Sequence, residues 1–166
     1  MSITKLGDNI VHTNGDVPTV GSSAPDFTLT DNKLADVTLN SFKGHPVVLN
    51  IFPSIDTSTC AQSVREFNRR AASLSRCVVL CISKDLPFAM KRFCAAEGID
   101  RVMTLSDFRS NDFAGNYHVQ MIDGGMRGLF ARVVIVIDEF GIIKHTQVTP
   151  TIGEEPDYEA ALKALI

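Results

Sequence analysis

The sequence predicts an α/β fold in which a central mixed β-sheet carries helices on both faces. Two continuous apolar runs rich in β-branched residues, 46–52 and 77–83, are typical of buried parallel strands. A segment with apolar residues at helical spacing separates these runs. A strand–turn–strand pattern over 132–149 predicts an antiparallel hairpin in the same sheet. Parallel and antiparallel strands are therefore expected together.

The composition is that of a globular protein, and 166 residues suit a single domain spanning 1–166. The formal charge is −3, from 16 basic and 19 acidic residues, and no basic stripe is present, so we expect no nucleic-acid partner. No segment approaches the ~18 apolar residues that a membrane span needs. The first residues lack a signal-peptide pattern. We therefore expect a cytoplasmic protein with no membrane partner.

The N-terminal part of the chain is predicted to form strands outside the main pattern. Residues 3–6 and 10–13 flank a GDN turn and predict an extra N-terminal β-hairpin. A stretch punctuated by Pro and Gly at 15–30 predicts an irregular segment. Residues 35–42 alternate between apolar and polar types, which predicts an edge strand.

The segment between the two buried runs is predicted to be a helix. Val64, Phe67, Ala71 and Leu74 share one of its faces. Strand, helix and strand then form a βαβ unit, whose two strands pair in parallel.

A second helix is predicted over 85–98, with Asp85 as its N-cap, Pro87 in its first turn and Gly98 at its end. The remaining elements are a strand at 102–107, a short helix within 110–118, the hairpin of 132–138 and 142–149, and a C-terminal helix over 155–166 with Pro156 at its start. This order of elements is a thioredoxin-like layout with extra N-terminal strands.

Four cysteines require an explanation: Cys60, Cys77, Cys81 and Cys94. In a reducing compartment they serve catalysis, metal binding or packing. Cys77 and Cys81 lie four residues apart on one predicted strand, so their Cα atoms are ~13 Å apart, beyond the ~7 Å limit of a disulfide. We interpret Cys81 as a small buried hydrophobe and Cys77 as structural too.

The sequence predicts neither a metal site nor a bound cofactor. It contains no C-x-x-C pair. Its histidines, at positions 12, 45, 118 and 145, are scattered without the spacing of metal ligands.

Cys60 occupies a position that favours reactivity. Asp56, Thr57 and Ser58 all suit a helix N-cap, so Cys60 falls within or just beyond the first helical turn. Unsatisfied backbone N–H groups and the helix dipole favour an anion there, and the thiolate is the nucleophilic form of cysteine. The alternative is that Cys60 extends the apolar face of the helix as a core residue.

Two neighbours of Cys60 favour the reactive interpretation. The hydroxyl of Thr57, three residues earlier, can reach the sulfur or a bound ligand. Pro53 ends the buried strand and has no backbone N–H, which favours a fixed, irregular loop.

Pro53, Thr57 and Cys60 also form the pattern P-x-x-x-T-x-x-C, which resembles that of the peroxiredoxins. Around it, "LNIFPSIDTSTCAQSVREFN", "VVLCISKDLPFAMKRFC" and "EPDYEAAL" are similar to the bacterial thiol peroxidase family, which comprises atypical two-cysteine peroxiredoxins. The resemblance runs from "GSSAPDFTL" to the C-terminal helix and places Cys94 at a family position.

The resemblance implies a role for each residue. Cys60 would be the peroxidatic nucleophile, which a hydroperoxide oxidises to a sulfenic acid. Thr57 would orient thiolate and peroxide, and Pro53 would shield the pocket from water. Arg132, at the start of a later strand, would stabilise the thiolate and the leaving oxygen. Cys94 would resolve the sulfenic acid by forming a disulfide with Cys60.

Each of these roles has a structural alternative. Thr57 can serve only as a helix cap. Arg132 can be an ordinary charge at a strand end, with Arg127 or Arg109 in its place. Cys94 lies on the apolar side of its helix and can be a core residue.

The resemblance further implies hydroperoxide substrates, with alkyl or lipid hydroperoxides preferred, thioredoxin as reductant and a homodimer. Two other functions compete on the same fold. A general thiol–disulfide oxidoreductase is disfavoured, because Thr57 stands where its second cysteine would be. A peroxide sensor or redox-regulated binding protein shares the first chemical step.

A disulfide between Cys60 and Cys94 requires Cα atoms within ~7 Å. Both residues are predicted to lie in regular helix. We therefore expect the reduced fold to hold them farther apart, so that local unwinding precedes disulfide formation.

Overall fold

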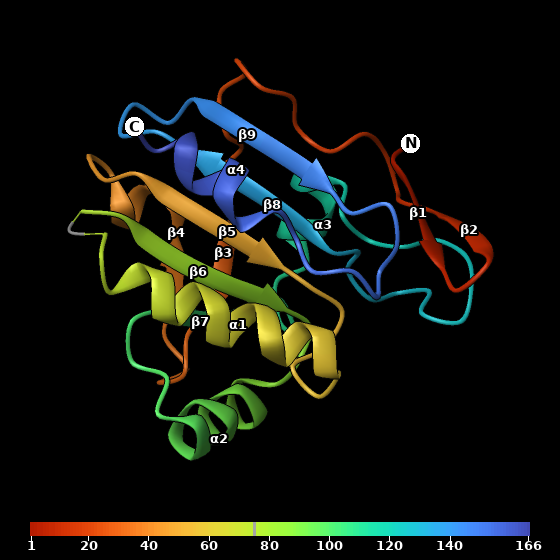
Figure 1. The fold of residues 1–166 in the computed structure, drawn as a ribbon, viewed down its shortest axis with the longest axis horizontal. Helices are drawn as coiled ribbons and strands as arrows, with labels where there is room; N and C mark the ends of the chain where they lie inside the picture. Colours follow the sequence, from red (N-terminus) through yellow and green to blue (C-terminus); the bar gives the residue numbers. More distant parts are fainter. Residues whose placement is uncertain (75) are drawn as a thin grey trace.

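A computed structural model describes residues 1–74 and 76–166, which form a seven-stranded mixed sheet and a separate two-stranded hairpin (Figure 1). The order of strands in the sheet is β4-β3-β7-β6-β5-β8-β9, and β1 pairs with β2 in the hairpin. The strands are β1 (Ile3–Leu6), β2 (Asn9–His12), β3 (Thr28–Thr30), β4 (Asp36–Thr38), β5 (Val47–Ile51), β6 (Val78–Ser83), β7 (Met103–Ser106), β8 (Val133–Ile137) and β9 (Ile143–Val148). The helices are α1 (Ser58–Ala71), α2 (Pro87–Glu97), α3 (Asp112–Tyr117), α4 (Tyr158–Lys163) and a 3₁₀ helix, η1 (Leu39–Phe42).

The centre of the sheet is the predicted βαβ unit. β5 pairs in parallel with β6, and β6 pairs in parallel with β7. β8 runs antiparallel to β5 on its other side, and β9 runs antiparallel to β8. Every residue of β5 and β8 is buried, which explains their continuous apolar runs. The predicted mixed sheet and N-terminal hairpin are both confirmed.

Alternate residues of the central strands face two hydrophobic cores. Leu49 and Ile135 belong to one core, which α3 covers through Phe113. Val48 and Val134 belong to the other core, which contains residues of α1, α2 and α4. In Figure 1, α1 and α4 lie in front of the sheet and α3 lies behind it. The prediction of helices on both faces is confirmed.

The edge of the sheet near the N-terminus differs from the prediction. The strand expected over 35–42 ends at Thr38, and η1 follows it. The Thr38 N–H donates to Ser41 Oγ, and the Leu39 N–H donates to the Asp26 carboxylate, so side chains replace strand pairing there. β3 was not predicted, because its three residues are too short to show alternation.

Two predicted helices are longer than those observed. α1 ends at Ala71, so Leu74 lies beyond the helix and not on its apolar face. α4 begins after Asp157, whose carboxylate accepts a hydrogen bond from the Ala160 N–H and caps the helix. Pro156 therefore precedes the cap instead of opening the helix.

The predicted N-cap of α2 is also wrong. Leu86 occupies that position with extended backbone, because the carboxylate of Asp85 is engaged with the loop before α1. Pro87 lies in the first turn, as predicted. Gly98 ends the helix in the left-handed region, at φ +66°, also as predicted.

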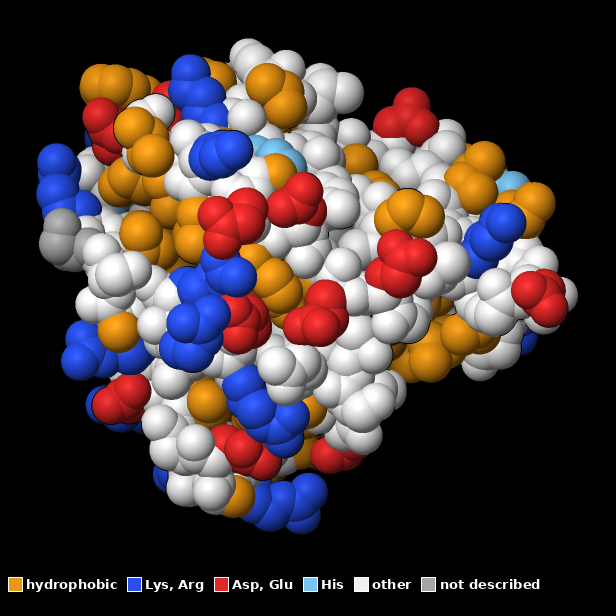
Figure 2. Space-filling model, in the orientation of Figure 1, with side chains coloured by type: hydrophobic (Ala, Val, Ile, Leu, Met, Phe, Trp, Pro, Cys, Tyr) orange, Lys and Arg blue, Asp and Glu red, His pale blue; other side chains and the backbone are white. Residues whose placement is uncertain are grey.

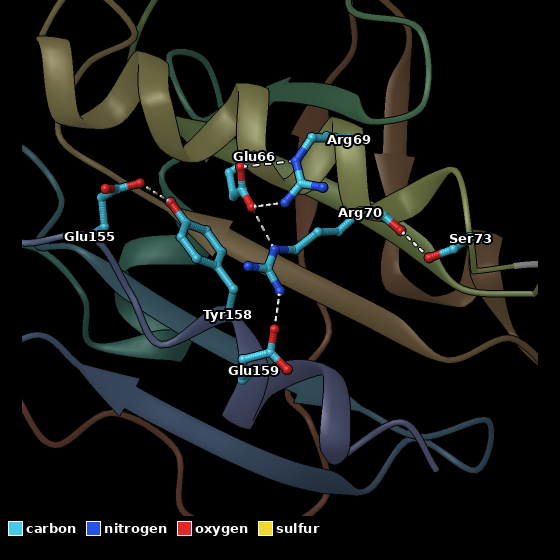
Figure 3. A network of polar contacts seen from close by, with 7 residues as sticks. All are labelled: Glu66, Arg69, Arg70, Ser73, Glu155, Tyr158 and Glu159. Carbon is cyan, nitrogen blue, oxygen red and sulfur yellow. Dashed lines mark hydrogen bonds and ion pairs between the residues drawn. The ribbon is translucent and has the colours of Figure 1, made fainter.

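The short helix α4 is held against the second half of α1 by polar and aromatic contacts (Figure 3). Arg70 of α1 bridges Glu159 of α4, at 2.6 Å, and Glu66 of its own helix, at 2.7 Å. The Tyr158 ring packs edge-on against Phe67, with 5.1 Å between ring centroids. Because isolated helices of this length are unstable, these contacts and core packing keep α4 in place.

The surface carries charges of both signs. Figure 2 shows acidic and basic side chains interspersed over one face of the molecule, in keeping with the nearly balanced totals of 16 and 19. Within the described part of the chain, no helix has the length and apolar character needed to cross a membrane.

Candidate active site

Cys60 lies in the first turn of α1, as predicted. Thr57 occupies the N-cap position with extended backbone, and Cys60 is the third helical residue after it. The backbone N–H groups of this turn have no acceptor within the helix, and the helix dipole is positive there. The Cys60 side chain has no exposed area. A buried sulfur therefore lies where a negative charge is stabilised.

Arg132 provides the positive charge beside this sulfur. It directly precedes β8, which pairs with β5, the strand that leads into the Cys60 loop. Its Nη2 donates a hydrogen bond to Cys60 Sγ at 3.2 Å, and its Nε donates to the Ile152 carbonyl at 2.9 Å. Arg132 is only 1% exposed, so both bonds form in a sheltered environment. A buried guanidinium needs such partners, and a thiolate is a suitable one.

The third nitrogen of this guanidinium, Nη1, has N–H groups without an acceptor among the described residues. This nitrogen is also buried. Leaving a buried charged donor unpaired costs free energy, about 1–3 kcal/mol or more. An oxygen atom of a bound ligand would satisfy this donor beside the Cys60 sulfur.

The two other arginines considered for this role lie elsewhere. Arg109 donates to the Asp36 carboxylate and to the Leu34 carbonyl at the edge of the sheet. Arg127 is exposed in the segment before β8. The geometry therefore favours Arg132 over both alternatives.

Thr57 does not serve as a side-chain cap. Its hydroxyl donates to the Ser54 carbonyl at 3.1 Å and makes no capping bond to α1. This bond closes the loop between β5 and α1 and leaves the lone pairs of the hydroxyl oxygen as potential acceptors. Pro53 is buried in the same loop, as expected for a residue that shields the site.

Asp85 anchors the loop between β5 and α1, a role that the sequence did not predict. Its carboxylate accepts hydrogen bonds from the Ile55 N–H at 2.7 Å, from Ser54 Oγ at 2.8 Å and from Ser83 Oγ at 2.6 Å. Such charge-assisted bonds are stronger than neutral ones, so they fix the path of the chain into α1. The available signal was its position, just after a buried strand, at the edge of the sheet where parallel strands end.

Cys94 lies on α2, so each of the two proposed redox cysteines sits in regular helix, as predicted. Both are free thiols in the structure. Burial raises the pKa of the half-buried Cys94 thiol, and the nearby Thr104 hydroxyl partly offsets this effect. Cys94 is therefore held in its protonated, unreactive form while α2 stays folded.

Arg65 ties α1 to α2 close to Cys94. Its Nε and Nη2 donate to the two carboxylate oxygens of Glu97, at 3.0 and 2.9 Å. Its guanidinium also lies over the Phe93 ring, 5.6 Å from the centroid. Glu97 and Phe93 flank Cys94 on α2, so moving Cys94 away from its site disturbs these contacts.

Cys81 and Cys77 have the surroundings of structural residues. Cys81 is fully buried in β6, and burial raises the pKa of its thiol to about 12. Burial raises the pKa of the Cys77 thiol to about 11. Cys77 lies just before β6 and not on the strand as expected. Neither thiol is ionised at neutral pH, so neither is activated as a nucleophile.

The described residues contain no cluster of three or more His, Cys, Asp or Glu that could hold a metal ion. His12, for example, pairs instead with Asp123, with 2.7 Å between Nδ1 and Oδ2.

A thioredoxin-like sheet with a cysteine in the first turn of α1, and an arginine held on its sulfur, defines a thiol-based redox protein. The sequence model of the Redoxin family matches residues 19–162, and the chain belongs to this family.

The relatives of the chain are similar over its full length. It is 51% identical to the thiol peroxidases of Mycobacterium tuberculosis (strain ATCC 25618 / H37Rv) and Mycobacterium bovis, over 99% of each chain. The crystal structure of a peroxiredoxin-like protein from Aquifex aeolicus matches 98% of this chain and 95% of its own, with a TM-score of 0.92 and 34% identity. A thiol peroxidase from Chromobacterium violaceum shares the fold, with a TM-score of 0.89.

Proposed function

We propose that the protein is a thiol-specific peroxidase, which reduces hydrogen peroxide and organic hydroperoxides to water and alcohols through Cys60. The observation that carries this proposal is the 3.2 Å contact between Arg132 Nη2 and Cys60 Sγ at the start of α1. The family and the 51% identity to thiol peroxidases support the same reaction.

In the first step the Cys60 thiolate attacks one oxygen of the hydroperoxide. The S–O bond forms as the O–O bond breaks, which oxidises the sulfur to a sulfenic acid and releases an alkoxide or hydroxide. A proton then converts this product to an alcohol or water. Negative charge moves from the sulfur to the leaving oxygen during the step. The buried guanidinium of Arg132, which contacts the sulfur and has a free donor at Nη1, would stabilise that charge at both positions.

Thr57 and Pro53 prepare the site for this attack. The Thr57 hydroxyl, whose proton is donated to the Ser54 carbonyl, would accept a hydrogen bond from the peroxide and orient it. Pro53, buried in the same loop, would shield the sulfur and adds no backbone donor that would compete for it. Because Cys60 is fully buried, hydroperoxide and water alike reach its sulfur only when the surrounding loop opens.

In the second step Cys94 resolves the sulfenic acid. Its sulfur attacks the Cys60 sulfur, a disulfide forms, and the hydroxyl leaves as water. A disulfide requires Cα atoms within ~7 Å. Because both cysteines lie in regular helix, we expect part of α1 or α2 to unwind before the two sulfurs meet. Unwinding also exposes Cys94, which lowers its raised pKa and increases its thiolate fraction.

A dithiol reductant must then regenerate both thiols. We propose thioredoxin as this reductant, a homodimer as the assembly and the cytoplasm as the location, with alkyl or lipid hydroperoxides as preferred substrates. A peroxide sensor would undergo the same oxidation but would not turn over. Multiple turnover with a reductant therefore separates the two functions.

The test is peroxide-dependent oxidation of thioredoxin by the wild type and by Cys60→Ser, Cys94→Ser and Cys77→Ser, with cumene hydroperoxide and hydrogen peroxide. We expect Cys60→Ser to be inactive and Cys94→Ser to react once and stop. Cys77→Ser, the control for a half-buried thiol outside the site, should keep full turnover. Unchanged turnover of Cys60→Ser would disprove the proposed function.

A further inference from the structure

We propose that the N-terminal hairpin β1–β2 is a clamp that positions Arg132 on Cys60, acting through residues 149–152. This inference rests on the proposed role of Arg132 in the peroxidase reaction. The hairpin is not part of the seven-stranded sheet. In Figure 1 it lies at one end of the molecule, beside the segment that follows β9.

The segment 149–152 holds Arg132 through both its backbone and its side chain. The Thr149 N–H donates to the Arg132 carbonyl at 3.2 Å. The Ile152 carbonyl accepts a hydrogen bond from Arg132 Nε at 2.9 Å. An arginine side chain has several rotatable bonds, and an acceptor for Nε selects one orientation of the guanidinium fork. The position of Ile152 therefore sets where Nη2 lies relative to the Cys60 sulfur.

The hairpin binds the same segment through Thr4 and Lys5 of β1. The Thr4 hydroxyl donates to the Thr149 carbonyl at 2.8 Å, and Thr4 is only 1% exposed. The Lys5 N–H donates to the Pro150 carbonyl at 3.1 Å, and the Ile152 N–H donates to the Lys5 carbonyl at 2.9 Å. The N–H of Ile152 is therefore bonded to the hairpin, while its C=O is bonded to Arg132.

The segment has little regular structure of its own to fix it. It connects β9 to α4, and no helix or strand is assigned between Val148 and Tyr158. Pro150 and Gly153 are exposed. Thr59 of α1 adds a further tie, from its hydroxyl to the Gly153 carbonyl at 3.2 Å. The same short connection thus contacts the hairpin, Arg132 and the helix that carries Cys60.

We call the hydrogen bonds between β1 and residues 149–152 the clamp bonds. The test removes one of them by Lys5→Pro, which deletes the N–H that donates to the Pro150 carbonyl. The N–H and C=O of Lys5 both point toward residues 149–152, away from β2. Lys5 and its cross-strand partner Ile10 are therefore a non-hydrogen-bonded pair, and the Ile10 N–H does not bond to β1. Ile10→Pro is therefore the matched control, a proline in the same hairpin that removes no clamp bond. Thr4→Val, which deletes one hydroxyl at constant shape, is the second variant if Lys5→Pro does not fold.

We expect Lys5→Pro to slow oxidation of Cys60 by hydroperoxide roughly tenfold, since displacing a catalytic group by about 1 Å can cost up to about 10²-fold. Alkylation of Cys60 by iodoacetamide at fixed pH should slow in parallel, and Thr4→Val should act in the same direction. The rate at which the reductant reduces the disulfide should not change. Melting temperatures and circular dichroism identify any variant that has lost its fold. Ile10→Pro should match the wild type in both Cys60 rates.

A double-mutant cycle shows whether the hairpin acts through Arg132. In an Arg132→Met background, Lys5→Pro should cause no further fall in the rate of Cys60 oxidation. An equal further fall would overturn the clamp, and so would unchanged rates in both Lys5→Pro and Thr4→Val. If Arg132→Met itself leaves Cys60 oxidation unchanged, the proposed role of Arg132 fails, and the clamp fails with it.

Discussion

At the scale of single residues, the site depends on the shape of the Arg132 side chain as well as on its charge. The planar guanidinium holds the Ile152 carbonyl with one nitrogen and the Cys60 sulfur with another. A lysine ammonium carries the same charge at one point on a flexible chain and cannot reproduce this fork. The fork explains why an arginine, and not simply a cation, occupies this position.

Replacing Arg132 by Lys is expected to slow Cys60 oxidation by about 10²-fold, the loss typical of removing one oriented donor from a transition state. Rapid mixing with hydroperoxide, followed by trapping of the sulfenic acid, measures this rate. Arg109→Lys is the control, because Arg109 pairs with Asp36 at the far edge of the sheet. A wild-type rate in Arg132→Lys would show that charge alone is sufficient.

At the scale of elements, the proposed disulfide step joins residues of two different helices. α1 carries Cys60 and α2 carries Cys94, and Arg65 joins the helices through Glu97 and Phe93. Arg65 and Glu97 are partly exposed, at 41% and 35%. An ion pair of this kind contributes about 0.2–1 kcal/mol. It is therefore strong enough to slow the opening of the helices but too weak to prevent it.

Arg65→Ala is expected to speed disulfide formation between Cys60 and Cys94 by up to about fivefold, the rate equivalent of at most about 1 kcal/mol. Acid quenching after one equivalent of hydroperoxide, followed by mass spectrometry, follows the disulfide. Arg69→Ala is the matched control, because Arg69 pairs with Glu66 within α1 and does not join the helices. A slower rate in Arg65→Ala would mean that Arg65 assists resolution instead of restraining it.

At the scale of the whole molecule, Asp107 makes stability depend on pH. It is fully buried after β7, and no side chain among the described residues donates a hydrogen bond to its carboxylate. Burial raises its pKa to about 6, and the positive charge of Lys84 partly offsets this effect. The backbone N–H groups of Asn111 and Ala114 also lie close enough to lower its pKa. The unfolded value is about 3.9, so the folded state binds the proton more tightly than the unfolded state. The contribution of Asp107 to stability is therefore complete below about pH 4 and is lost as the pH rises through about 6.

Asp107→Asn, which cannot ionise, is expected to raise the free energy of unfolding at pH 7 by about 1–3 kcal/mol and to change it little at pH 4. Urea unfolding at both pH values measures the difference. Asp123→Asn is the control, and it should change the free energy of unfolding in the opposite direction, because hydrogen bonds from His12 lower the pKa of Asp123. Its effect should be destabilising at pH 7. Equal effects of Asp107→Asn at both pH values would contradict the assignment.

Local sequence patterns were enough to predict most of the fold. The apolar runs of β5 and β6, the hairpin of β8 and β9 and the start of α1 all follow from neighbours in the chain. The predictions that differ from the structure concern short elements or helix ends, such as β3 and the N-cap of α2. There a side chain bonded to a distant segment decides the outcome, as Asp85 does by binding Ile55 instead of capping α2.

By itself, the sequence determined that Cys60 stands at the start of a helix, because N-caps and apolar spacing are short-range signals. The family resemblance pointed to Arg132, but the residue pattern alone did not exclude Arg109 or Arg127. Only the tertiary structure shows the contact itself: Arg132 is 72 residues from Cys60 in the chain, and its Nη2 lies 3.2 Å from the Cys60 sulfur. The same holds for the hydrogen bonds of Asp85 to the Cys60 loop and for those of the N-terminal hairpin to residues 149–152. Contacts between distant segments depend on how strands pair and pack, and residue order alone does not reveal them.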